Sequence, residues 1–153
     1  MRSRTVVMVC MANQCRSPMA EYLLKRRLGP GSKWTVLSAG TSAIPGSRAS
    51  ASAVEVMARM GVDISAHRSK LVTEELVDSA EIVITMTRSQ RDEIVNCFPG
   101  ARDKVFTLKS LSSERAGLDV ADPAGMSASD YQLTRDEIDE IIPDVVRFLH
   151  DQE

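Results

Sequence analysis

The chain alternates between short apolar runs and longer segments with helical periodicity. The β-branched run at 4–10 is typical of a strand buried on both faces of a parallel sheet. Further strands are expected at 34–40, 81–86 and 103–108, and helices at 17–29, 51–61 and 88–98. This order predicts an α/β fold over residues 1–153: a single-domain, doubly wound three-layer sandwich with a central four-stranded parallel sheet and helices on both faces.

Residues typical of helix ends mark two of these helices. Ser17 is a natural N-cap for the first helix, Pro18 suits its first position, and Gly29 suits its end. Gly61 is expected to end the second helix in the same way.

The last helix has an apolar stripe at helical spacing, formed by Ile138, Ile141, Ile142, Val145, Val146 and Leu149. Pro143 lies within this stripe, so we expect a kink or a break into two helices there.

Composition narrows the function classes. The net charge of −2 and the six aromatic residues argue against nucleic acid as a partner. No stretch approaches the ~20 apolar residues that span a bilayer, and the N-terminal apolar run is shorter than that of a signal peptide. Three cysteines without an export signal favour reduced thiols and a cytoplasmic location. Their spacing does not suit zinc, and we expect neither a metal nor a cofactor.

The segment after the first strand carries the candidate chemistry. Cys10 ends the strand, five residues follow, and Arg16 and Ser17 precede the first helix. A loop curled between a strand and a helix N-terminus points successive backbone N–H groups inward and forms an anion site. Arg16 adds a planar fork for phosphate oxygens, and the positive surroundings favour a Cys10 thiolate that can attack phosphorus. The hydroxyl of Ser17 is placed to donate to that thiolate.

A simpler interpretation takes Cys10 as a small hydrophobic residue that ends a strand and Arg16 as an ordinary surface charge. That would be favoured for a lone buried cysteine. The combination of Cys10, Arg16 and Ser17 at a strand-to-helix junction is far more specific, so we favour the functional interpretation.

At these residues the sequence resembles the low-molecular-weight protein tyrosine phosphatases, in a bacterial branch that also includes protein arginine phosphatases. The family loop is matched by Cys10, Met11, Ala12, Asn13, Gln14, Cys15, Arg16, Ser17, Pro18, Met19, Ala20 and Glu21. The resemblance continues through SAGTSAIPG, DISAHRS, TEELVDSAEIVITMTRSQRD and VADPAG, which covers nearly the whole chain. Ala12 departs from the family, which usually has Gly there; if the position needs a positive φ, Ala12 would be strained.

The resemblance implies roles for single residues. Cys10 is the expected nucleophile, Arg16 the phosphate clamp, and the loop from Met11 to Ser17 the phosphate-binding element. The Asp-Pro pair at 122–123 matches the family's general acid, although Asp-Pro is also common in turns. Asp122 would protonate the leaving group and then activate water. Asp119 is expected to be structural.

Further roles follow from the same resemblance. Asn13 is expected to hold the loop in shape, with His67 as its support or simply as a structural residue. Cys15 would be a redox partner that forms a reversible disulfide with Cys10, or else a loop residue without a role. Cys97 falls in a predicted helix and is expected to lie in the core.

The substrate is less well defined by these residues. A phosphorylated protein is the expected partner, acted on by a monomer or weak dimer, with phosphotyrosine as the first choice because it is the family's default. Aromatic walls for a phenyl ring are missing, since Ile44 and Ala124 stand at the two places. Phosphoarginine is the alternative, although Gln14 and Ala124 differ from the arginine-specific members.

Two other functions are weighed. Arsenate reduction needs further cysteines beyond the third strand, where Thr87 and Arg88 stand. A non-catalytic phosphate-binding module would need neither the thiol of Cys10 nor the acid of Asp122. Both rank below a metal-independent phosphatase.

Overall fold

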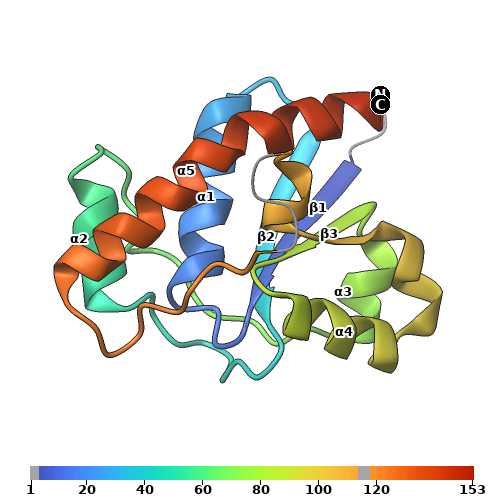
Figure 1. Ribbon diagram of the computed structural model, residues 1–153, viewed down its shortest axis with the longest axis horizontal. Coiled ribbons are helices and arrows are strands. Elements are labelled where there is room, and N and C mark those ends of the chain that lie inside the picture. Colours follow the sequence, from blue (N-terminus) through green and yellow to red (C-terminus); the bar gives the residue numbers. More distant parts are fainter. Residues whose placement is uncertain (1–3, 114–117) are drawn as a thin grey trace.

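The computed structural model describes residues 4–113 and 118–153 (Figure 1). Its sheet has four parallel strands in the order β2-β1-β3-β4. The strands are β1 (Arg4–Cys10), β2 (Trp34–Gly40), β3 (Ile82–Thr85) and β4 (Val105–Thr107). The α/β fold and the four-stranded parallel sheet predicted from the sequence are confirmed.

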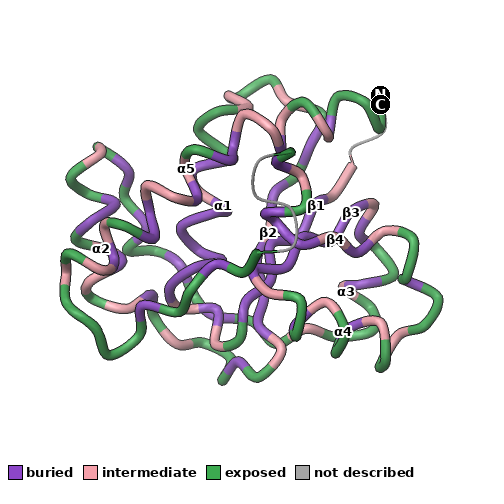
Figure 2. The backbone as a smooth tube through the Cα atoms, in the orientation of Figure 1, coloured by how far each residue is buried: buried purple, intermediate pink, exposed green. Residues whose placement is uncertain are grey.

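Helices cover both faces of the sheet. One face packs against α1 (Arg16–Leu28) and α5 (Ala128–Asp151), with α2 (Ala51–Ala58) beside α5. The other face packs against α3 (Glu74–Ser79) and α4 (Arg88–Cys97). Alternate residues of β1 enter the two cores, and the buried backbone in Figure 2 follows the strands between them. Because all four strands are parallel, their carboxyl ends lie at the same edge of the sheet.

The strand register brings the chemistry to that edge. Cys10 is paired with Gly40 at the end of β2, and the preceding residue of β1 is paired with Thr85 at the end of β3. Parallel open sheets bind ligands beyond the carboxyl ends of their strands. Cys10 therefore lies where such a fold presents its site.

The start of α1 differs from the sequence prediction. The helix begins at Arg16, so Ser17 lies inside the first turn and is not the N-cap. The hydroxyl of Ser17 instead contacts Cys10 and Asn13, and Cys15 stands at the N-cap without capping the helix through its side chain. Pro18 occupies the third helical position, where the missing N–H is still one of the unpaired four. Gly29 follows the helix with φ +79°, as predicted.

The helix α2 is Ala51–Ala58, and Gly61 closes it in the turn that follows, as predicted. Gly61 has φ +76° and donates its N–H to the carbonyl of Ala58, while the N–H of Val62 donates to the carbonyl of Met57.

The break at Pro143, one of the two outcomes expected there, is not found. The helix α5 runs through the proline as one element, with buried apolar residues before and after it, and it packs against α1.

Cys97 is exposed, which corrects the expectation that it lies in the core. The buried residues of α4 are Gln90 and Ile94, so the last turn, with Cys97 at its end, is left to solvent.

The sequence analysis also missed three short elements. These are α3 and two 3-10 helices, Pro99–Lys104 and Leu108–Leu111. A start signal for α3 was present: Thr73 caps it by accepting from the N–H of Leu76.

Gly40 controls how closely β2 approaches the loop after β1. A Cβ at this position would lie 3.0 Å from the N atom of Asn13 and 2.9 Å from the Cβ of Ala43, and closer still to the carbonyl of Met11. We predict that Gly40→Ala lowers the free energy of unfolding by about 1–3 kcal/mol, because backbone must shift to relieve the overlap. Urea unfolding measures this.

The matched control is Gly31→Ala, where no atom lies within 4 Å of the added Cβ. Equal stability changes in the two variants would contradict the close approach at Gly40.

Candidate active site

The sulfur of Cys10 lies at the floor of the loop. Cys10 is 2% exposed, and its Sγ accepts from the backbone N–H of Asn13 at 3.3 Å. The Oγ of Ser17 lies 2.9 Å from the same sulfur. Two polar groups of the loop and of the first helical turn thus converge on one thiol.

Asn13 fixes the loop through both ends of its side chain. Its Oδ1 accepts from the backbone N–H of Lys70 at 2.9 Å. Its Nδ2 donates to Ser17 Oγ at 2.7 Å and to Ser38 Oγ at 3.0 Å. Because Ser17 Oγ accepts from Asn13, its own proton is free for the sulfur of Cys10.

His67 supports the same residue from the other side. Its Nε2 lies 2.8 Å from the carbonyl oxygen of Asn13. A carbonyl only accepts, so Nε2 must carry the proton. The contact places His67 where the resemblance expected it.

The positive φ of the loop falls at Asn13, at +58°, and not at Ala12. Asn is among the few residues that adopt this conformation readily. Ala12 is therefore unstrained, and its difference from the family's usual Gly leaves the loop shape unchanged.

Arg16 is buried at the first position of α1, with 4% of its surface exposed. Its Nη1 donates to the carbonyl of Val120 at 3.0 Å. Its Nε is buried and has no partner in the described part of the chain. A buried guanidinium with an unpaired donor, at a helix start that lacks a side-chain cap, is suited to an oxyanion.

Asp122 reaches the site from the segment before α5. Its Oδ2 lies 3.6 Å from Nη2 of Arg16, and its side chain is 37% exposed. Its Oδ1 accepts from the N–H of Ala124. Asp119, the nearby competitor, instead accepts from the backbone N–H of Arg88 at the start of α4, which agrees with a structural role.

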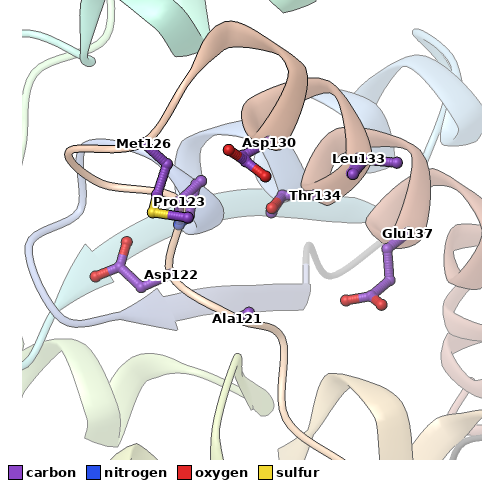
Figure 3. A pocket seen from close by; sticks show the side chains of 8 residues that line it. All are labelled: Ala121, Asp122, Pro123, Met126, Asp130, Leu133, Thr134 and Glu137. Carbon is purple, nitrogen blue, oxygen red and sulfur yellow. The ribbon is translucent and has the colours of Figure 1, made fainter.

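A cavity of about 210 Å³ lies beside Asp122. Figure 3 shows it between the Asp-Pro segment and the first turns of α5. Its walls are Ala121, Asp122, Pro123, Met126, Asp130, Leu133, Thr134 and Glu137. The cavity combines exposed apolar side chains with three carboxylates and adjoins the loop of Cys10 through Asp122.

Cys15 belongs to the loop, but its side chain contacts other residues than that of Cys10 does. Its Sγ is 3.3 Å from the hydroxyl of Tyr131 and 3.4 Å from Ser50 Oγ. Burial raises the pKa of the Cys15 thiol, and the two hydrogen bonds offset this only in part. The redox role of Cys15 stays a prediction.

Sequence reasoning missed the outer partners of this network. Ser38 Oγ donates to Glu21 Oε1 at 2.5 Å, and Glu21 is paired with Lys25. Glu21 and Ser38 stood inside segments that carry the resemblance, but neither was assigned a role, and Tyr131 carried no signal because its contact joins distant segments.

Two features are absent from residues 4–113 and 118–153. No group of three or more His, Cys, Asp or Glu residues there is arranged to hold a metal ion. None of the helices in the same ranges is long and apolar enough to cross a membrane.

The fold and this loop define a phosphate-binding α/β domain, and comparisons with known proteins give its family. Residues 5–153 match the family described as low molecular weight phosphotyrosine protein phosphatase. The chain therefore belongs to the low-molecular-weight protein tyrosine phosphatase family.

The relatives in this family are named for different substrates. The chain is 43% identical over 137 residues to a protein-arginine-phosphatase of Geobacillus stearothermophilus, covering 90% of both chains. It is also 43% identical over 120 residues to a probable low molecular weight protein-tyrosine-phosphatase, EpsP, of Ralstonia nicotianae, covering 78% of both. The YwlE arginine phosphatase structure from Geobacillus stearothermophilus matches with a TM-score of 0.89 and 40% identity, covering 97% of this chain and 94% of that one.

Because the Cys15 thiol is buried, we predict that the free energy of unfolding decreases at alkaline pH. Its pKa in the folded protein lies above the ordinary value of 9.0, so the unfolded chain loses this proton first as pH rises. Cys15→Ala should therefore lose less free energy of unfolding than the wild type between about pH 7 and about pH 10. Urea unfolding at several pH values measures the difference.

Cys97→Ala removes an exposed thiol and serves as the control, with a pH dependence equal to that of the wild type. The same pH dependence in Cys15→Ala would contradict the burial effect.

Proposed function

We propose that the protein is a metal-independent protein phosphatase that removes phosphate from arginine side chains through a phosphocysteine at Cys10. The observation that carries the mechanism is the buried guanidinium of Arg16. Its Nε has no partner among the described residues, and it stands at the start of the helix whose first turn contacts the Cys10 thiol. An oxyanion bound above that thiol would supply the missing partner.

In the first step the Cys10 thiolate attacks phosphorus. The Arg16 guanidinium and the backbone N–H groups of the loop from Met11 to Ser17 hold the phosphate oxygens. The sulfur–phosphorus bond forms as the phosphorus–nitrogen bond breaks, and Asp122 gives its proton to the departing nitrogen. This requires Asp122 to be protonated when substrate is bound.

In the second step water replaces the leaving group. Asp122, now a carboxylate, takes a proton from the water, which attacks phosphorus and breaks the sulfur–phosphorus bond. Inorganic phosphate leaves, and the Ser17 hydroxyl stabilises the returning thiolate. The proposed roles of Cys10, Arg16 and Asp122 are those that the motif predicts.

Arginine is preferred over tyrosine as the substrate for two reasons. Relatives at 43% and 40% identity over 90% or more of this chain are protein-arginine-phosphatases, which favours the alternative that the sequence analysis ranked second. The cavity also carries the carboxylates of Asp130, which accepts from Ser127, and of Glu137, which is paired with Lys109; this negative charge suits a guanidinium better than a neutral phenol.

The site also lacks what a phenyl ring needs. None of the chain's aromatic residues lies on the loop 10–17, the segment 41–48 or the segment 119–126. Gln14 and Ala124 differ from the residues of the arginine-specific members. The proposed site must therefore recognise the guanidinium without an aromatic wall.

Phosphotyrosine remains the second candidate, because the matching family and EpsP are described by that activity. Arsenate reduction is disfavoured, since Thr87 caps α4 where a relay cysteine would stand. The exposed Cys97 lies at the far end of that helix.

A side-by-side rate comparison tests the substrate. We predict that kcat/KM for a phosphoarginine peptide exceeds that for the same peptide with phosphotyrosine by about tenfold or more, because a site built for one polar group rejects its replacement. Phosphate release measured with chelator present checks this together with metal independence.

The control is Cys10→Ser, which should hydrolyse neither peptide. Faster turnover of phosphotyrosine would move the protein to the second candidate, and undiminished turnover by Cys10→Ser would refute the mechanism itself.

A further inference from the structure

Three exposed cations lie on two neighbouring segments beside the phosphate loop. Arg48 lies on the segment after β2, and Arg68 and Lys70 lie on the segment before α3. We call Arg48, Arg68 and Lys70 the basic rim. All three are exposed, although the chain as a whole carries a net charge of −2.

The segment 67–70, which carries two residues of the basic rim, is hydrogen-bonded to the phosphate loop. The N–H of Lys70 donates to Asn13 Oδ1, and His67 contacts the Asn13 carbonyl. Along 67–70 burial alternates, with His67 and Ser69 buried and Arg68 and Lys70 exposed. Residues two apart in an extended segment share a face, so Arg68 and Lys70 lie together on the outer one.

Arg48 joins the other two by a direct pairing. It is the bridge partner of Arg68 in an antiparallel arrangement. The N–H of Ser69 donates to the carbonyl of Ser47, and the N–H of Ser47 donates to the hydroxyl of Ser69, which holds the two segments together. Like charges directly opposite each other in an antiparallel pair are destabilising, yet the fold places two arginines at such positions.

Nothing in the described part of the chain neutralises these charges. The segments 41–50 and 64–72 contain no Asp or Glu. The only side-chain bonds of Arg68 run to the backbone carbonyls of Ser65 and His67, and neither Arg48 nor Lys70 has a side-chain bond or ion pair among the described residues. The basic rim therefore presents uncompensated positive charge next to the site.

We propose that the basic rim binds acidic side chains that flank the phosphorylated residue of a protein substrate. The proposal rests on the proposed function only in that the substrate is a phosphoprotein. Exposed Ile44 and Leu71 lie on the same two segments and add apolar surface for the flanking chain. Complementary charge at a rim raises the rate of productive encounter and selects among partners.

The test uses three peptides that differ only beside the phosphorylated residue, with Glu, Gln or Lys as neighbours. The wild type should hydrolyse the Glu peptide with a kcat/KM about three- to tenfold above that of the Gln peptide, and added salt should reduce this ratio. Arg48→Gln and Lys70→Gln should bring the ratio towards one, and Arg48→Glu should favour the Lys peptide. The ratio is taken within each enzyme, so a general loss of activity cancels.

Arg27→Gln is the matched control, because it removes an exposed arginine from the far end of α1. It should keep the wild-type ratio. A wild-type ratio of one, or an equal change in Arg27→Gln, would overturn the proposal, as would a ratio that survives in Arg48→Gln and Lys70→Gln. Inhibition by an RNA oligonucleotide with equal turnover of all three peptides would assign the basic rim to nucleic acid and would also overturn it.

Each peptide is made with phosphoarginine and with phosphotyrosine, and an aryl phosphate without flanking residues is assayed beside them. Absence of any hydrolysis would refute the proposed function. Hydrolysis that ignores the neighbours would refute only the role of the basic rim.

Discussion

The site depends on the conformation of Asn13. Its φ of +58° turns the loop so that its own N–H points at the Cys10 sulfur. Its side chain then joins three segments that are far apart in the sequence, through Ser17, Ser38 and the backbone of Lys70. These bonds are all made within the protein and fix the loop, so its N–H groups need little reorganisation to receive charge.

A second set of contacts ties the acid to the phosphate clamp. Val120 donates its N–H to Met86 after β3, and its carbonyl accepts from Arg16. Asp122 lies two residues further on, with its Oδ2 3.6 Å from the Arg16 guanidinium. The group proposed to bind phosphate and the group proposed to transfer a proton are thereby held at one edge of the sheet, although 106 positions separate them in the numbering.

The local sequence pattern was enough to predict the sheet, its neighbouring helices and the loop of Cys10. The pattern gave wrong predictions where contacts between distant parts of the chain determine the local structure. Ser17 has the residue type of an N-cap, yet its hydroxyl is taken by Cys10 and Asn13. Pro143 should interrupt a helix, yet packing against α1 maintains it. Ser38 lies in the segment SAGTSAIPG that carries the resemblance, but its bond to Asn13 joins distant parts of the chain and could not be predicted, and the same holds for the contact of Tyr131 with Cys15.

In the proposed mechanism Cys10 forms a covalent bond to phosphorus and Asp122 donates and then accepts the proton. Asp122→Asn lacks the acid of the first step, but an aryl phosphate with an acidic phenol as leaving group needs no proton from the enzyme. With that substrate the variant should slow mainly the second step, so a phosphoryl group should accumulate on the enzyme. Intact-protein and peptide mass spectrometry after rapid quenching of Asp122→Asn with substrate measures this directly. We predict the added mass of one phosphoryl group on Cys10; turnover without any adduct, or an adduct on another residue, would contradict the account.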